Sequence, residues 1–344
     1  YVMALVAFLG IPSQLGIPTL STREIAVTNA RKDWAHMKGL IRRAHQGIAL
    51  LTLVTNPAVA QSPTPPPLLL LPGSTRAMGL GNAYVAGSGA DVIFYNPAQV
   101  GESRNTVIST QRFGSRASLA SLATNTAALG LSIGFAAQYI EYGAESEDGS
   151  TRIGALARGG DFASSSVLGL MSASIERNGI RMGVTGKYLA QQVAIGRQST
   201  PSLDIGFAGD LSFVAIGLVL SAPDGIFDNG STPRLRLPTR ATVGAMVSGR
   251  PISTWLDAGI AASVSTDKRG RVIGGGGVEL TYVRVSGWSF TGRAGLQAAA
   301  QPEYRGTSPL TLGATVNADR LSVDYAFQQL KGEGATHRVG VRIR

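Results

Sequence analysis

Apolar or small side chains alternate with polar ones over most of residues 105–344. A period of two is typical of strands, because successive side chains of a strand point to opposite faces. The same region shows no amphipathic pattern longer than about three helical turns. The alternation therefore predicts about fourteen strands, at residues 105–112, 115–124, 127–142, 165–176, 180–193, 202–209, 211–221, 239–247, 255–264, 271–283, 288–297, 310–316, 321–327 and 336–344.

The clearest hairpin surrounds the dipeptide Asn178-Gly179. Asn-Gly supplies the two positive φ angles that a type I′ turn requires. In the strand that follows, Arg181 and Lys187 fall on one face, whereas Met182 falls on the other, which is apolar or small throughout. The pattern predicts a sheet with one polar and one apolar face.

The length and number of the predicted strands favour a closed sheet. Several exceed the five or six residues usual in soluble sheets, and nine to eleven residues suit a tilted strand that crosses a bilayer. An open sheet of this size would leave edges that need protection, and closure removes them. The aromatic content of 6% is low for the interface girdles of membrane barrels. The pattern favours an all-β fold, a closed antiparallel transmembrane β-barrel, with an exported soluble β-sandwich as the alternative.

The N-terminal region has a different character. Residues 1–21 carry no charge and are long enough to span a bilayer as a helix, but Pro12 and Pro18 disfavour one. Residues 17–46 resemble an early membrane-helix and loop region of polysaccharide flippases, whose further membrane helices this chain does not contain. Residues 1–36 are therefore interpreted as an upstream or fused segment outside the mature fold.

Residues 37–60 have the layout of a secretory signal peptide. A basic stretch is followed by a short apolar one, and the small residues Ala58 and Ala60 form a cleavage site before Gln61. Residues 61–72 are rich in proline and predict a stiff linker. These features predict export of the chain.

Composition excludes several kinds of chemistry. The chain has no cysteine, which rules out disulfides, CxxC zinc sites and a cysteine nucleophile. Its net charge is +10, but the first 60 residues hold six Lys/Arg and two Asp/Glu, which leaves 25 against 19 in the rest. This mild and dispersed excess gives no support to a nucleic-acid partner.

No enzyme motif is apparent either. His36, His45 and His337 lie far apart in the sequence, and neither GxSxG nor HExxH occurs. The glycine run 274–277 leads into a strand and not into a helix, so it is interpreted as a site of close packing against contents of the lumen, not as a phosphate-binding loop. No catalytic residue, metal or cofactor is predicted.

A glycine-rich stretch at residues 73–100 precedes the first predicted strand. It is too rich in glycine for one stable helix, since each interior glycine costs roughly 1 kcal/mol relative to alanine. We expect an extended piece at 78–86, a turn at 87–89, and one or two helical turns capped by Asp91. Pro97 is expected to end that helix near Asn96.

Motifs at both ends of residues 70–344 resemble one protein family. Gly79-Leu-Gly-Asn-Ala-Tyr-Val-Ala and Phe94-Tyr-Asn-Pro-Ala are similar to the N-terminal region of FadL-like outer-membrane proteins. Leu321-Ser-Val-Asp-Tyr-Ala-Phe and Thr336-His-Arg are similar to the end of PorV/PorQ-type barrels, and Leu237-Pro-Thr-Arg-Ala-Thr-Val-Gly to a strand entry in the middle of such chains. The closest group is the PorV/PorQ family.

The resemblance implies a fourteen-stranded barrel at residues 105–344 with residues 73–104 folded into its lumen as a hatch or plug. Two sets of residues follow from the matched motifs. The implied hatch residues are Arg76, Gly79, Gly81, Asn82, Tyr84, Asn96, Pro97 and Ala98. The implied pattern near the C-terminus consists of Asp324, Tyr325, Phe327, His337, Arg338 and Gly340.

The last residues also resemble the signal that the barrel-insertion machinery reads, polar–x–Gly–x–x–hydrophobic–x–aromatic. Arg338, Gly340 and Ile343 match its first positions, and the final aromatic residue has no counterpart. The insertion machinery and outer-membrane lipid are therefore expected partners, and the cell outer membrane is the expected location.

The resemblance implies two kinds of function and leaves them open. FadL-like proteins pass hydrophobic small molecules across the outer membrane, whereas PorV-like proteins serve type IX secretion and bind exported cargo. Four acidic residues on predicted strands are expected to point into the lumen, where they are interpreted as a solvated wall. They are Asp204, Asp257, Glu279 and Asp324.

Overall fold

The chain forms two units, Tyr1–Asn56 and Pro57–Arg344, and a computed structural model describes part of the second. The described residues run from 67 to 344. Gaps within them fall at 70, 114–116, 143–163, 194–195, 223–236, 238, 268–269, 271, 284–286, 300–306 and 331–333. The predicted upstream segment, the signal peptide with Ala58 and Ala60, and most of the linker lie outside the described residues.

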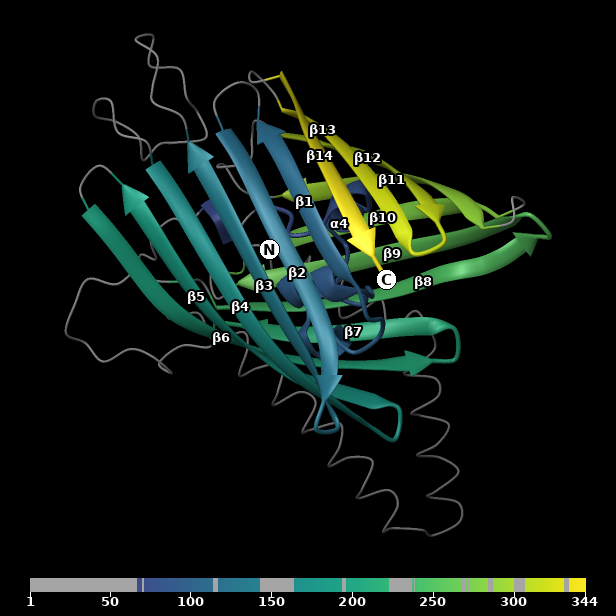
Figure 1. Ribbon diagram of the computed structural model, residues 1–344, viewed down its shortest axis with the longest axis horizontal. Helices are drawn as coiled ribbons and strands as arrows, with labels where there is room; N and C mark the ends of the chain where they lie inside the picture. The colour runs from purple at the N-terminus through teal and green to yellow at the C-terminus, as the bar shows by residue number, and fades with distance from the viewer. Residues whose placement is uncertain are drawn as a thin grey trace. The chain divides into compact units, whose positions relative to one another are not determined.

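Fourteen antiparallel strands in the described part of the chain form one closed barrel (Figure 1). Each strand pairs with its neighbours in sequence, and β1 pairs with β14 to complete the ring. The strands are β1 (Thr106–Phe113), β2 (Ala117–Ala128), β3 (Leu131–Tyr142), β4 (Ser164–Arg177), β5 (Ile180–Val193), β6 (Gly196–Leu211), β7 (Val214–Ser221), β8 (Arg240–Ser253), β9 (Leu256–Asp267), β10 (Val272–Tyr282), β11 (Trp288–Ala299), β12 (Thr307–Ala318), β13 (Leu321–Leu330) and β14 (Gly334–Ile343). The predicted fold class, a closed antiparallel barrel, is confirmed.

The hairpin between β4 and β5 forms as the sequence predicts. Asn178 and Gly179 have φ angles of 53° and 76°, the left-handed pair of a type I′ turn. Along β5 the side chain of Arg181 is buried and that of Met182 is exposed. The polar face of the hairpin therefore points to the inside of the barrel.

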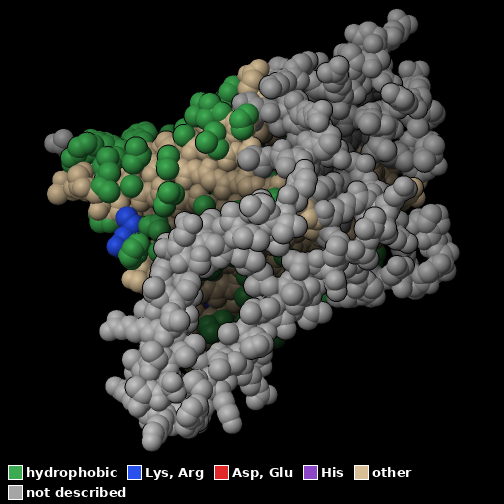
Figure 2. Space-filling view, turned by 180° about the vertical axis from the view of Figure 1, so that it is seen from behind, with side chains coloured by type: hydrophobic (Ala, Val, Ile, Leu, Met, Phe, Trp, Pro, Cys, Tyr) green, Lys and Arg blue, Asp and Glu red, His purple; other side chains and the backbone are tan. Residues whose placement is uncertain are grey.

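The outer surface of the barrel is apolar. Large hydrophobic side chains are exposed on outward positions of the strands, and Figure 2 shows them gathered over the part of the strand surface that is visible in that view. Aromatic side chains collect at the end where β6–β7, β8–β9 and β10–β11 turn back, and Trp255 packs edge-on against Tyr282 at 5.9 Å. A low total aromatic content thus still provides part of an interface girdle at this end.

Short helical turns precede the first strand, and only the one at 90–94 falls where the sequence predicts a helical turn. They are η1 (Pro67–Leu69), α4 (Thr75–Gly79), η2 (Ala90–Phe94) and η3 (Pro97–Gln99). Residues 75–79 are helical because Ser74 caps α4, its hydroxyl accepting a hydrogen bond from Ala77 N. Asn96 begins η3 and does not end η2, since its side chain accepts from Ala98 N and proline suits the first helical position.

These turns lie within the ring of strands. The helix α4 contacts β11 to β14, η2 contacts β1 to β4, and η3 contacts β4 to β7. Their buried apolar residues join inward side chains of the strands in one hydrophobic cluster. None of the described helices is long and apolar enough to cross a membrane. The core of the unit is thus built between the N-terminal segment, here residues 71–104, and the barrel wall.

Some strand boundaries differ from the predicted ones. The pattern at 127–142 predicts one strand, but Leu129 and Gly130 form a turn with positive φ angles, 56° and 76°. Residues 127 and 128 therefore belong to β2. The strand β6 is longer than predicted and includes Pro201, which lacks a backbone donor. The turn at Leu129 and Gly130 lies in a run without polar residues, so the sequence pattern does not show it. Pro201 makes the first part of β6 look unlike a strand.

Candidate functional site

An ionic cluster joins α4 to the barrel wall. The Nη2 atom of Arg76 donates to Oε1 and Oε2 of Glu279 at 2.8 and 3.1 Å. The Nε atom of Arg293 donates to the same carboxylate at 3.1 Å. The side chains of Arg76 and Glu279 are 13% and 6% exposed. One buried carboxylate is therefore shared by two guanidinium groups, one from the N-terminal segment and one from β11.

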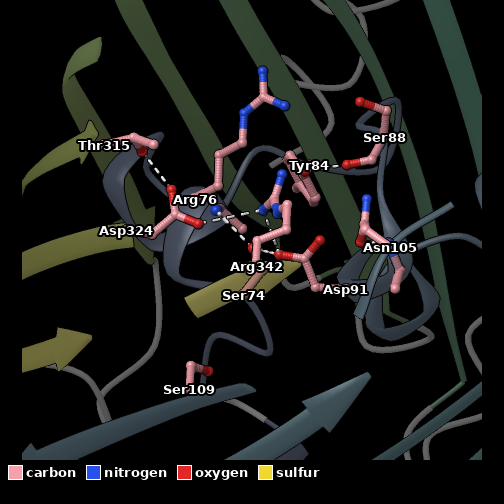
Figure 3. Close-up of polar contacts among 12 residues, drawn as sticks. Ser74, Arg76, Tyr84, Ser88, Asp91, Asn105, Ser109, Thr315, Asp324 and Arg342 are labelled. Atoms are coloured by element: carbon pink, nitrogen blue, oxygen red, sulfur yellow. Dashed lines mark hydrogen bonds and ion pairs between the residues drawn. The ribbon is translucent and has the colours of Figure 1, made fainter. Parts of the chain in front are cut away.

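The cluster continues along the barrel wall, from β12 to β14, through Asp324 and Arg342 (Figure 3). Thr315 donates to Asp324 Oδ1 and accepts from the Arg293 guanidinium at 2.5 Å. The Nη2 atom of Arg342 lies 3.5 Å from Asp324 Oδ2 and 3.4 Å from Asp91 Oδ2. Asp91 belongs to η2, so the network returns from the wall to the N-terminal segment.

Charge within this network is balanced. It contains three arginines, namely Arg76, Arg293 and Arg342, and three carboxylates, namely Asp91, Glu279 and Asp324. The interpretation of Glu279 and Asp324 as a solvated wall is wrong, because both are nearly inaccessible to solvent. Sequence alternation places such residues inside the barrel, but it does not show that a separate segment covers them.

Arg338 on β14 holds the start of the N-terminal segment. Its side chain is fully buried, and its two terminal nitrogens donate to Pro72 O at 2.5 Å and Gly73 O at 2.9 Å. A guanidinium group presents its donors in a fixed fork, which suits two successive carbonyl oxygens. The sequence pattern singles out Arg338 as part of a strand motif, and the structure adds a contact with the segment at 72–73.

Asn96 and Pro97 are seated against β5 to β7. The Nδ2 atom of Asn96 donates to Val85 O at 2.9 Å and to Phe207 O at 3.3 Å. A Cβ atom added at Gly206 would overlap Asn96 Oδ1. A Cβ added at Gly183 would lie 2.5 Å from Pro97 O. This corner is therefore held by an amide and by glycines that allow close approach, without an ion pair of its own.

The backbone of the N-terminal segment also packs directly against the backbone of the barrel wall at Gly79 and Gly81. Gly81 has a φ of 64°, and a Cβ added there would overlap Leu296 O. On β10, a Cβ at Gly275 would overlap Gly81 O, and one at Gly277 would lie 2.7 Å from Leu80 Cα. The glycine run is thus explained by close packing, but only at its two inward positions.

Two tyrosines, the buried Tyr84 and the half-buried Tyr95, stabilise the fold of the segment itself. Tyr84 donates to Ser88 O at 2.5 Å, and Tyr95 donates to Asn82 Oδ1 at 2.6 Å. Burial raises the pKa of both phenols above its ordinary value, which keeps them protonated donors. Asn82, one of the implied hatch residues, accepts its hydrogen bond from within the segment.

A cavity of about 160 Å³ lies beside the N-terminal segment, with Ala222 and Leu237 in its lining. Apolar side chains from η1, the segment and β4 form part of its lining, and polar wall residues such as Lys187 and Asp204 form the rest. Lys187 and Asp204 are themselves ion-paired. The apolar lining residues are Leu68, Leu69, Leu71, Val85, Phe94, Leu168, Leu170 and Leu237.

A second cavity of about 260 Å³ has a different lining. It is lined by Arg76 of α4 and by the wall residues of the ionic cluster. Asp257, another of the four predicted lumen acids, also lines it. Its remaining side chains are Ser, Thr, Asn and Arg. Both cavities are therefore lined in part by the N-terminal segment, and only the first also has large apolar side chains in its lining.

Residues of the C-terminal pattern divide between the two faces of the barrel. Asp324, Arg338 and Gly340 point inward, where a Cβ added at Gly340 would lie 2.8 Å from the Thr75 hydroxyl. Tyr325 and His337 lie on the outer face and share a hydrogen bond of 2.8 Å. The ring of Phe327 lies 5.5 Å from that of His337. The pattern is thus two separate clusters.

Comparison with known proteins identifies the fold. No protein-family model and no curated protein sequence matches the chain. The toluene transporter TodX of Pseudomonas putida is similar in structure, with a TM-score of 0.51 and 9% identity over 79% of this chain and 97% of that one. A FadL homologue of Pseudomonas aeruginosa has a TM-score of 0.50 and 10% identity over 78% and 98%. At this identity the comparison establishes a shared barrel fold.

Proposed function

We propose that the chain is an outer-membrane barrel that binds hydrophobic small molecules and passes them across the membrane. The apolar outer face of the closed ring supports an environment of outer-membrane lipid. The same face argues against the exported soluble protein considered above, because a soluble barrel would expose these side chains to water. The outer membrane is accordingly the proposed location.

The leucine-lined cavity is the observation that carries this proposal. Leu168 and Leu170 point into it from β4, and Leu68 faces them from η1. Ligand sites are typically concave and combine apolar side chains with polar groups that fix orientation. Here the leucines form one part of the lining, and polar wall residues such as Lys187 and Asp204 form another part of similar size. The toluene transporter of P. putida shares the fold, which makes apolar molecules the first class to test.

Residues 73–104 act in this proposal as a hatch. The segment contributes residues to the lining of both cavities, and in this proposal a ligand passes through the barrel only when part of the segment moves. The predicted hatch residues contribute in different ways: Arg76 by charge, Asn96 and Pro97 by their seat on the wall. A transport channel with a hatch also accords with the absence of any predicted catalytic role.

Binding of an apolar fluorescent probe to the detergent-purified protein tests the proposal. We expect Leu168→Asp to weaken binding at least tenfold, because the carboxylate would have to be desolvated by the probe. Met171→Ala on the outer face is the matched control and should bind as the parent protein does. Equal affinity in the parent and Leu168→Asp proteins would refute the assignment of the cavity.

The PorV/PorQ assignment, with binding of secreted cargo, is the second candidate function and rests on the sequence motifs. Its test is co-purification of exported proteins with the barrel from native membranes. Recovery of a cargo protein together with unchanged probe binding in Leu168→Asp would favour secretion over transport of small molecules.

A further inference from the structure

The first and last strands of the barrel meet where the N-terminal segment makes many of its polar contacts. β1 and β14 pair over eight residues, from Thr106↔Ile343 to Phe113↔Thr336. We propose that the segment has a second function, as an internal template that aligns these two strands and so promotes closure of the barrel. This function is independent of what the barrel transports.

Arg338 is the centre of the contact. Besides Pro72 O and Gly73 O, its guanidinium donates to Gln111 Oε1 at 3.1 Å and to Ser109 Oγ at 2.8 Å, both on β1. It also donates to Ser121 Oγ on β2 at 2.7 Å. One fully buried side chain of the last strand thus bonds the segment and the first two strands together.

The segment itself bridges the two sides of this seam. On the β14 side, Arg342 lies 3.4 Å from Asp91. On the β1 side, Ala90 N donates to Asn105 Oδ1 at 2.9 Å, directly before β1 begins. The hydroxyl of Ser74 donates to Asp91 Oδ2 at 2.5 Å and links α4 to η2. Contacts to β14 and to the start of β1 are therefore joined through a single short network.

Closure of this seam differs physically from formation of the other pairs. Each other pair joins neighbouring strands, whereas β1 and β14 are separated by more than 200 residues. The entropy lost on closing a loop grows with its length, and non-local pairing is slow for the same reason. A segment that binds both strands lowers this cost. The helix α4 docks on the last strands, η2 docks on the first strands, and contact between α4 and η2 then brings β14 and β1 together.

Disulfide trapping during refolding into detergent micelles tests the template. The natural chain has no cysteine, so an introduced pair reports one contact. Thr110→Cys with Val339→Cys, opposite each other on the outer face, reports the seam. Ala173→Cys with Val184→Cys reports the β4–β5 hairpin. We expect Arg338→Met to slow seam trapping about tenfold and to leave hairpin trapping unchanged, because it removes buried donors to the segment, β1 and β2 and none within the β4–β5 hairpin.

Two further variants keep the test decisive. Ser74→Ala cuts the link between α4 and η2 without touching a strand, and it should also slow the seam selectively. Arg181→Gln on β5 removes contacts to Glu102, at the far end of the segment, and to Asp210 on β6. It should not change seam trapping. Equal seam rates in Arg338→Met, Ser74→Ala and parent proteins would overturn the proposal. So would equal slowing of the seam and the hairpin. Probe binding at Leu168 is not part of either readout, so the transport proposal stands or fails separately.

Discussion

The two halves of the N-terminal segment are held to the barrel by different physics. Around α4 and η2, buried charges are shared with β10, β11 and β14, in addition to the close glycine contacts at Gly79 and Gly81. Around η3, the contact consists of one amide side chain and a backbone pressed against glycines of β5 to β7. The first half is therefore held by buried charges as well as by shape, and the second by shape and one amide.

This difference determines how each half responds to change. A buried ion pair contributes little net stability against an apolar replacement, but removal of one partner leaves a buried unpaired charge. A glycine seat has no such charge, and its sensitivity comes from the space that a side chain would need. The charged half is therefore more sensitive to single substitutions that unbalance it, and the shape-fitted half to substitutions that add volume.

Glu279→Ala should have the largest effect. It leaves Arg76 and Arg293 facing each other without their shared carboxylate, and loss of one partner of a buried pair costs roughly 3–5 kcal/mol. We expect a matching decrease in the free energy of unfolding in urea and a higher current through the protein in planar bilayers. The double variant Arg76→Met, Glu279→Leu removes one charge of each sign and leaves Arg293 beside Asp324 and Thr315, so it should lose much less. A double variant as unstable as Glu279→Ala would show that packing, and not charge, holds α4.

Gly217→Ala should be next in size. Its added methyl group would overlap Val85 O and lie 2.8 Å from Asn96 Nδ2, and overpacking costs roughly 1–3 kcal/mol. We expect reduced stability and a raised bilayer current, because the corner at Asn96 and Pro97 cannot seat. Gly169→Ala on β4 is the matched control, since its Cβ would meet nothing within 4 Å. Similar losses in both variants would indicate a general effect of glycine in strands.

Asn96→Ala should cost less, roughly 1–2 kcal/mol, as expected for a lost helix cap with its hydrogen bonds. Asn96→Asp separates the two roles of the side chain, because a carboxylate keeps the acceptor for Ala98 N but cannot donate to Val85 O or Phe207 O. We expect a raised current in both variants. If Asn96→Ala kept the full stability of the parent protein, steric fit alone would hold this corner.

Much of the barrel follows from the sequence, and much of the site does not. Strand alternation is a local property, so both ends of β5 are predicted correctly. The Asn178-Gly179 turn is predicted together with its backbone geometry. Contacts between the segment and the wall are non-local: Arg76 meets Glu279 across 203 positions of the chain. Periodicity shows that Glu279 points inward, but not which side chain it meets there. The burial of the cluster, and therefore its contribution to stability, depends on this contact, which the sequence does not reveal.

Tyr325→Phe should have the smallest effect of all, and it sharpens the comparison by testing a polar contact outside the segment. The Tyr325 hydroxyl bonds His337 Nδ1 at 2.8 Å on the outer face, where both groups are partly exposed. We place this face against lipid, where hydrogen bonds between side chains contribute only roughly 0.6 kcal/mol on average, so we expect a loss of about that size and an unchanged bilayer current. Tyr84→Phe, which removes a buried bond of the segment to Ser88 O, is the interior counterpart and should cost about 1 kcal/mol. If the outer substitution cost as much as the inner one, the segment could no longer be regarded as the place where polar contacts stabilise this barrel.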